Sequence, residues 1–339
     1  MRLLQFFLST MLGILIAQGA MAQTQNLFHN KNLKMIVPYA PGGSYDLYAR
    51  VVAEHMRVHV PGAASLIVQN MPGAGGMVAV QNIYSREPQD GTSLAIMPRE
   101  IVTNQLLRPE AAKYDSRKFG WVGSVCAYSG VLYLASRVNV RSAGDLRSRE
   151  IIIGSWGQGT DSFNTPTVLN AVAGTKFRVV VGYSGGPEID LAVERGEADG
   201  RVASWTFLKT QKPSWLQSDF ISVPFQTGLM RHPELPNVPL ITELAQDHDG
   251  KQILQIMNAD SGIGWSFATA PGVPPDVLSV LRKAFDATMA DRNFRADAEK
   301  RGLEVLPSTG LEIAQLVDAT LGTSEAVVQK LRSILDLPK

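Results

Sequence analysis

Short apolar runs alternate with longer helix-compatible segments through most of the chain. Each run is followed by a turn rich in glycine or proline and then by a stretch that can form a helix. Strands are expected at 33–39, 66–69, 94–97, 151–154 and 178–181, with helices at 45–60, 77–84, 187–195 and in a segment ending at 172. Strands that alternate with helices indicate mostly parallel sheets with helices on both faces, the α/β class.

The last third of the chain is more helical. A helix is expected over 276–289, where Val277, Val280, Leu281 and Ala284 recur at spacings of three and four. Thr309 and Glu312 have the spacing of a capping box, and 324–335 is expected to form a last helix. Because no flexible linker divides the chain, we expect two lobes joined by crossing segments.

The first residues predict export from the cytoplasm. Arg2 supplies a positive charge, 3–17 is almost wholly apolar, and Ala20-Met21-Ala22 has the small-x-small pattern of a cleavage site. The apolar stretch is shorter than the ~20 residues of a spanning helix. We therefore expect a signal peptide over 1–22 and a periplasmic protein, in which the lone Cys126 is a buried thiol.

Composition and charge narrow the range of partners. Cleavage would leave 317 residues (339 minus 22), enough for two domains. The formal net charge is +1, and no run of lysine and arginine occurs. Nucleic acid and anionic membrane surfaces are therefore not expected partners. Any preference for an anionic ligand must come from a few placed groups.

Three glycine-rich turns have the same design. The turns at 41–46, 154–161 and 182–187 each follow an expected strand and precede an expected helix. The first N–H groups of a helix lack internal partners and carry partial positive charge. Ser44 and Thr160 or Asp161 could cap their helices. Since ligands of open α/β sheets sit beyond the carboxyl ends of the strands, these turns are candidate anion sites.

Five motifs, in order, resemble those of the tripartite tricarboxylate transporter receptors, the Bug or TctC family of periplasmic binding proteins. They are Ile36-Val37-Pro38-Tyr39-Ala40-Pro41-Gly42-Gly43 with Asp46, Val68-Gln69-Asn70-Met71-Pro72-Gly73-Ala74-Gly75-Gly76, Gln89-Asp90-Gly91-Thr92-Ser93-Leu94, Gly182-Tyr183-Ser184-Gly185-Gly186 leading to Ala198-Asp199, and His232-Pro233-Glu234-Leu235-Pro236-Asn237-Val238-Pro239. The resemblance runs from about residue 33 to the end.

The resemblance implies a two-lobed periplasmic binding protein, or Venus flytrap, that captures a small carboxylate and delivers it to a membrane permease. It implies one lobe over 30–128 plus 262–339 and a second over 129–261, in a protein expected to be a monomer without cofactor, metal or enzymatic activity. The expected ligand contacts are Tyr39, Gly42, Gly43, Ser44 and Asp46 in the first lobe and Ser155, Gly157, Gly159, Thr160 and Asp161 in the second.

This sequence departs from the family pattern at several positions. Trp156 and Asp161 stand where small or hydroxyl residues are usual, and Arg99 and Arg201 stand near the ends of strands where uncharged residues are usual. We include Trp156, Tyr183, Arg99 and Arg201 among the candidate ligand contacts. Asp46 and Asp161 would repel an anion, but Arg99, Arg201 and the three helix N-termini would attract one. We therefore predict a carboxylate ligand, which could also carry a hydrogen-bond donor group.

Other functions remain open at this point. Residues 182–186 also fit the G-x-S-x-G turn of a serine hydrolase, with Ser184 as nucleophile, Asp219 or Glu234 as the acid and His248 as the base. A sensory co-receptor that presents its ligand to a membrane kinase would share every feature of a transport receptor.

Two further patterns carry less weight. His55 and His59 are four residues apart and could face one metal ion, but zinc needs at least a third ligand. The loop 73–76 has the glycines of a dinucleotide site except that Val78 stands where the last glycine is required.

Overall fold

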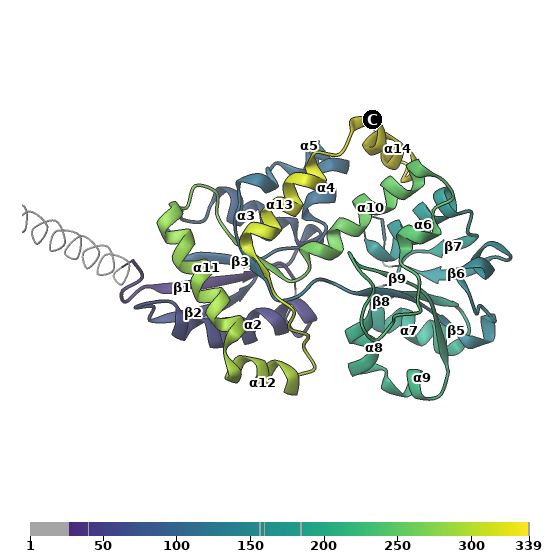
Figure 1. Cartoon of the computed structure of the whole chain (residues 1–339), viewed down its shortest axis with the longest axis horizontal. Coiled ribbons are helices and arrows are strands. Elements are labelled where there is room, and N and C mark those ends of the chain that lie inside the picture. The colour runs from purple at the N-terminus through teal and green to yellow at the C-terminus, as the bar shows by residue number, and fades with distance from the viewer. Residues whose placement is uncertain (1–26, 40, 156, 159, 184, 338–339) are drawn as a thin grey trace, which may run out of the picture.

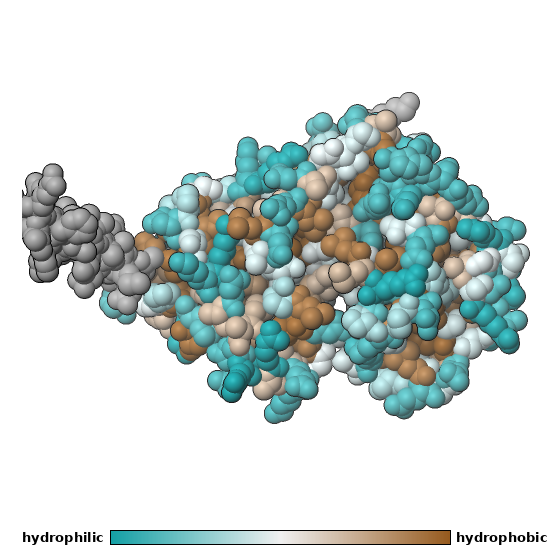
Figure 2. Space-filling model, in the orientation of Figure 1, coloured by the Kyte–Doolittle hydropathy of each residue, from teal (hydrophilic) through white to brown (hydrophobic). Residues whose placement is uncertain are grey.

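In a computed structural model, the chain forms two α/β lobes side by side (Figure 1). The structure describes residues 27–337 except 40, 156, 159 and 184. The expected signal peptide and the candidate contacts Trp156 and Gly159 therefore lie outside the described residues, as does Ser184. Figure 2 shows the lobes as two masses with an indentation between them on this face.

A six-stranded sheet forms the first lobe. Its strand order is β11-β4-β10-β3-β1-β2, with β1 (Asn32–Val37), β2 (Ser65–Asn70), β3 (Ser93–Ile96), β4 (Gly120–Ser124), β10 (Ser266–Thr269) and β11 (Ser308–Thr309). β1 pairs in parallel with β2 and β3, whereas β10 and β11 run antiparallel to their neighbours.

The alternation of side chains along these strands buries both faces of the first sheet. Met35 and Val37 pack on one face, in a cluster with α2 (Ser44–Met56), α11 (Pro275–Ala290) and α12 (Arg292–Lys300). Ile36 packs on the other, in a cluster with α3 (Met77–Ser85), α4 (Ile101–Leu107) and α13 (Gly310–Leu321). This three-layer arrangement fixes where α2 and α3 begin, at the carboxyl ends of β1 and β2.

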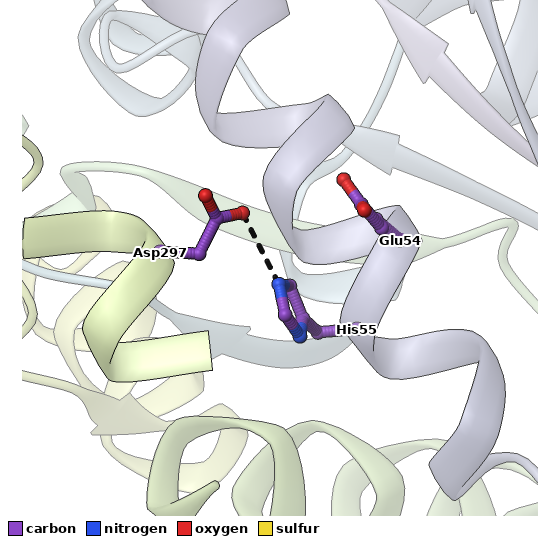
Figure 3. A group of neighbouring side chains, drawn as sticks. All are labelled: Glu54, His55 and Asp297. Carbon is purple, nitrogen blue, oxygen red and sulfur yellow. Dashed lines mark hydrogen bonds and ion pairs between the residues drawn. The ribbon is translucent and has the colours of Figure 1, made fainter. Parts of the chain in front are cut away.

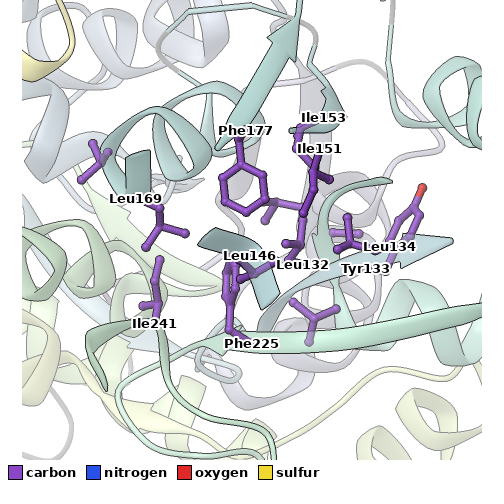
Figure 4. Packing of buried hydrophobic residues seen from close by; sticks show 14 of the residues in the cluster. Leu132, Tyr133, Leu134, Leu146, Ile151, Ile153, Leu169, Phe177, Phe225 and Ile241 are labelled. Atoms are coloured by element: carbon purple, nitrogen blue, oxygen red, sulfur yellow. The ribbon is translucent and has the colours of Figure 1, made fainter. Parts of the chain in front are cut away.

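The second lobe contains a five-stranded sheet of order β7-β6-β8-β5-β9. Its strands are β5 (Gly130–Ala135), β6 (Ile151–Gly154), β7 (Phe177–Val180), β8 (Gly200–Ser204) and β9 (Ile221–Thr227), and its helices include α6 (Asp161–Ala173), α7 (Gly186–Arg195), α8 (Trp205–Gln211) and α9 (Pro213–Gln217). Only β5 runs against its neighbours. Leu132, Phe177 and Phe225 lie in the core of this lobe (Figure 4).

The chain passes between the sheets more than once. It leaves the first sheet at Ser124 and joins the second at Gly130, and α10 (His248–Ile263) leads back to β10. Gly264, with φ +53°, makes this return possible, because a Cβ there would lie 2.1 Å from the carbonyl oxygen of Cys126. The last helix, α14 (Glu325–Ile334), packs Val328 and Leu331 into the core of the second lobe.

These observations confirm the expected two-lobed α/β architecture, in which each lobe has a mixed sheet flanked by helices. The expected lobe boundaries stay a prediction. Cys126 is buried, as expected from its apolar surroundings. Within the described part of the chain, no helix is both long and apolar enough to cross a membrane.

Candidate functional site: a cleft between the lobes

A cleft of about 800 Å³ opens between the two lobes. The N-terminal ends of three helices reach it: α2 with Gly43 and Ser44, α3 with Met77, and α6 with Thr160 and Asp161. Its described lining also includes Tyr39, Tyr45, Ala74, Gly75, Gln81, Arg99, Glu100, Asn104, Arg108, Ala111, Ala112 and Gln158. The starts of α2 and α6 were expected here, whereas that of α3 was not.

The N-terminal ends of these three helices carry no side-chain cap, as is also true of α11 and α14. The N-cap residues at the cleft, Gly43, Gly76 and Thr160, make no side-chain hydrogen bond to the first turn. Ser44 is the first helical residue and not the cap that the sequence suggested, and the Thr160 hydroxyl donates to the Gly157 carbonyl instead. By contrast, α10 and α13 are capped by Asp247 and Thr309. The cleft therefore presents helix N–H groups that no cap side chain satisfies, which suits an anion. At α3, however, the N–H groups of Met77 and Val78 already donate to the carbonyls of Ala74 and Gly73.

Arg99 is the cation at the centre of the cleft. Its guanidinium lies 3.5 Å from a carboxylate oxygen of Asp161 in the other lobe and 3.5 Å from one of Glu100. Its Cζ lies 3.4 Å from the ring centroid of Tyr128, a cation–π contact. The side chain is only 12% exposed, and its Nη1 has no hydrogen-bond partner among the described residues. Arg99 thus joins the lobes and keeps one donor unused.

A smaller cavity of about 60 Å³ shares Arg99, Glu100 and Asp161 with the cleft and adds Asp260. One oxygen of Asp260 accepts from the Thr103 hydroxyl at 2.7 Å, and the other, Oδ1, has no partner among the described groups. Burial raises the pKa of Asp260 well above its ordinary value, and burial also raises the pKa of Glu100. Repulsion from neighbouring carboxylates adds to both shifts, whereas Arg99 opposes them.

Asp46 holds the first cleft loop in place from beneath and does not line the cleft. Its carboxylate accepts hydrogen bonds from the Gly42 N–H, from Arg50 and from Asn70, each at 2.9 Å. Asn70 also donates to the Tyr39 carbonyl at 2.9 Å. Asp46 is 4% exposed and lines neither cavity. It therefore fixes the turn that carries Gly43 and Ser44.

We expect replacing Asp46 with asparagine to destabilise the protein by about 2 kcal/mol at neutral pH. The hydrogen bond from Arg50, opposed by burial and aided by Gly42 and Asn70, lowers the pKa of Asp46 from 3.8 to about 2. A depressed folded-state pKa contributes stability above the unfolded-state value, and that contribution is lost as pH falls toward 2. Urea unfolding of both proteins between pH 2 and 7 should therefore show a gap that closes at acid pH.

The matched control for this prediction is Asp318→Asn, because the Asp318 side chain is 66% exposed and forms a surface pair with Arg117. Its stability should stay within about 0.5 kcal/mol of the parent. An Asp46→Asn variant as stable as this control would show that Asp46 does not hold the loop.

Tyr45 and Tyr128 were not anticipated from the sequence. Tyr45 packs between Tyr39, at 4.6 Å between ring centroids, and the buried Trp265, at 4.8 Å. Its hydroxyl accepts a hydrogen bond from the backbone N–H of Arg99 at 3.1 Å. The aromatic wall of the cleft is thus tied to the segment that carries the central arginine. The only sequence signal for Tyr45 was its place inside the first glycine-rich motif.

The candidate contacts divide into two groups. Those that line the cleft are Tyr39, Gly43, Ser44, Arg99, Thr160 and Asp161. Those among the described residues that line neither cavity are Gly42, Asp46, Ser155, Gly157, Tyr183 and Arg201. Ser155 is buried beneath the second-lobe loop, where its hydroxyl accepts from the Gly157 N–H at 3.1 Å and bonds that of Ser162 at 3.0 Å. Ser155 and Gly157 shape the start of α6.

Arg201 lies in the interior of the second lobe. Its guanidinium donates to both oxygens of Asp190, at 2.7 and 3.2 Å, and lies 4.9 Å from the Phe207 ring centroid. Tyr133 donates to the same Asp190 at 2.5 Å. The start of α7 is beside this network, since a Cβ on Gly186 would lie 2.8 Å from Arg201 Nη2. This ion pair, and not the cleft, accounts for Arg201.

The acid and base proposed for a hydrolase do not meet. His248 is exposed at the first position of α10. Glu234 instead accepts from Trp205 at 2.6 Å and pairs with Lys209 at 2.8 Å. Asp219 lies in a turn with φ +51° before β9. Among the described residues, no acid contacts His248, so the geometry gives the hydrolase reading no support.

The two histidines of α2 connect this helix to α12 and its cap. His55 lies 3.2 Å from Asp297, and His59 lies 3.0 Å from Asp291. Glu54, His55 and Asp297 come close enough for a shared cation (Figure 3). Arg301, however, pairs with Asp297 at 2.8 Å and with Glu54 at 3.6 Å. A protein cation thus already balances these carboxylates.

Comparison with known sequences identifies relatives along nearly the whole chain. The sequence profile described as "Tripartite tricarboxylate transporter family receptor" matches residues 48–333. The "UPF0065 protein in gbd 5'region" of Cupriavidus necator is 24% identical over 94% of this chain and 92% of its own length. The "UPF0065 protein in tcbD-tcbE intergenic region" of Pseudomonas sp. (strain P51) is 26% identical over 66% of each chain.

Solved structures of the same fold include a TctC solute binding protein from Polaromonas, with a TM-score of 0.67, 16% identity and coverage of 90% of this chain and 98% of that one. The R. palustris protein Rpa4515, solved with adipate, has a TM-score of 0.64 and 21% sequence identity, and the match covers 90% of this chain and 97% of Rpa4515. MatC from Rhodopseudomonas palustris, solved with bound malate, has a TM-score of 0.58 and 18% sequence identity, and the match covers 90% of this chain and 98% of MatC. These likenesses establish the fold.

Proposed function

The chain belongs to the tripartite tricarboxylate transporter receptor family, and from this premise we propose that it is a periplasmic receptor that binds a small carboxylate between its lobes. The observation that carries the proposal is the cleft whose lining includes Arg99 and the uncapped N-terminal ends of α2, α3 and α6. Helix N-termini each favour an anion by roughly 0.3–1 kcal/mol when exposed and by more when partly buried. An arginine adds a charge-assisted hydrogen bond to a carboxylate.

We also propose how the receptor works when it binds and delivers its ligand. Contacts from both lobes meet at the Arg99–Asp161 pair, so a ligand held there would favour a closed arrangement of the lobes. We propose that 1–22 directs export, and that the loaded receptor delivers its ligand to the membrane permease of a tripartite transporter. Relatives solved with adipate and malate support a carboxylate cargo. In this account the protein binds its ligand and does not convert it.

A thermal-shift screen followed by calorimetry tests the proposal on the purified protein. The ligands are mono-, di- and tricarboxylates, amino acids and aromatic acids, each compared with its uncharged amide. At least one carboxylate should raise the melting temperature, because a ligand at about 100 times its Kd stabilises the folded state by about 2.7 kcal/mol. The amides should have little effect. The proposal fails if the best ligand is a cation or a neutral sugar, or if no carboxylate binds.

A further inference from the structure

The Arg99–Asp161 pair occupies the place where a ligand carboxylate would bind. Arg99 follows β3 of the first lobe, and Asp161 is the first residue of α6 in the second. Their 3.5 Å separation exceeds the ~2.7–2.9 Å of a tight charge-assisted hydrogen bond. The neighbouring cavities leave space on either side of the pair. The pair can therefore be opened by a ligand.

The inner cleft holds more negative than positive charge. Glu100, Asp161 and Asp260 surround Arg99, and the remaining cation of the lining, Arg108, lies in the wide cleft and not in the smaller cavity. Asp260 keeps one buried oxygen without a partner, although Thr103 bonds the other. Burial is the main cause of the raised pKa of both Glu100 and Asp260, and repulsion from neighbouring carboxylates adds to it.

This balance distinguishes between two kinds of carboxylate ligand. A plain dicarboxylate that binds Arg99, at the unused Nη1 or in place of Asp161, brings another anion beside Asp161 and Glu100. Removing one partner of a buried ion pair is costly, because the other charge is left without compensation. A ligand that also bears a cationic amine can separate the pair and still give both partners an opposite charge.

We propose that the ligand carries an ammonium group beside its carboxylate, with the carboxylate on Arg99 and the ammonium on Asp161. This inference rests on the proposed function and makes its ligand class more specific: an amino acid or a similar zwitterion. Asp161 then has two roles. It occupies Arg99 when the cleft is empty, and it selects for the amine when the cleft is filled.

Matched pairs of ligands test the inference by calorimetry. L-aspartate and succinate share one carbon skeleton and both carboxylates and differ only in the ammonium group, as do L-glutamate and glutarate, L-alanine and propionate, and L-phenylalanine and 3-phenylpropionate. The amino member of the best-binding pair should bind about 10- to 100-fold more tightly, the range for a hydrogen bond to a charged group.

The variant Asp161→Asn should shift the two members in opposite directions. The amino member loses an ionic partner and should bind about 10- to 100-fold more weakly. The plain member no longer competes with an internal carboxylate for Arg99 and should bind more tightly. Asp249→Asn, at a 60% exposed surface pair with Lys330, is the matched control and should leave both affinities unchanged. Thermal melting of each variant confirms that it is folded.

Equal or tighter binding of the plain member to the parent protein would overturn the inference, as would an Asp161→Asn effect of the same sign on both members. Either result leaves the carboxylate receptor standing. If no carboxylate binds at all, with or without an amine, the proposed function itself fails.

Discussion

Arg99→Met is expected to weaken binding of the carboxylate ligand by about 2–5 kcal/mol, roughly 30- to 5,000-fold. The guanidinium is buried between the lobes with Nη1 unused, so a ligand carboxylate there gains a contact that water does not screen. Methionine fills similar space without charge. Isothermal titration with the best ligand from the screen measures the loss.

Arg178→Met is the matched control, because the Arg178 side chain is 52% exposed and forms a surface pair with Glu150 in the second lobe. Its affinity should equal that of the parent. If Arg99→Met melts cooperatively and binds the ligand as tightly as this control, the ligand does not contact Arg99.

Arg201→Ala should instead destabilise the second lobe, by about 3–5 kcal/mol. The change leaves Asp190, which is 1% exposed, as a buried carboxylate that still accepts a hydrogen bond from the Tyr133 hydroxyl. Guanidinium-induced unfolding followed by circular dichroism measures the loss. The double variant Arg201→Met/Asp190→Leu should recover most of the stability, since both charges are removed together.

A loss below about 1 kcal/mol for Arg201→Ala would be the value of a surface pair and would contradict the buried network. Ligand affinity offers a second check. Because Arg201 lines neither cavity, variants that remain folded should bind the ligand as the parent does.

The sequence predicted those helices and strands that are bounded by turns rich in glycine or proline. The expected strands near β1, β2, β3, β6 and β7 and the helices near α2, α3, α7, α11, α13 and α14 are all present within a few residues. Strands such as β5 and β10 were not anticipated. Every residue of both is buried, so their sequences lack the alternation of polar and apolar positions that identifies a half-buried strand.

The sequence predicted the parts of the site that depend on local motifs, but not the contacts between the two lobes. Turn glycines located the starts of α2 and α6, because a strand, a tight turn and a helix follow one another along the chain. The contact between Arg99 and Asp161 depends on how two lobes pack, and nothing within either segment encodes it. For the same reason, the sequence could not show that Arg99 lines the cleft and Arg201 does not. Both arginines lie in or just after strand-like segments, and only the fold brings Asp190 against Arg201.

A crystal structure of the protein with its tightest carboxylate ligand tests the central claim most directly. The account predicts the ligand between the lobes, with its carboxylate within about 3 Å of Arg99 Nη1 and close to the uncapped starts of α2, α3 or α6. Asp161 should have left Arg99 and should contact the ligand's amine. A ligand bound outside the cleft, or one within it while Arg99 remains paired with Asp161 and the carboxylate lies elsewhere, would contradict the account.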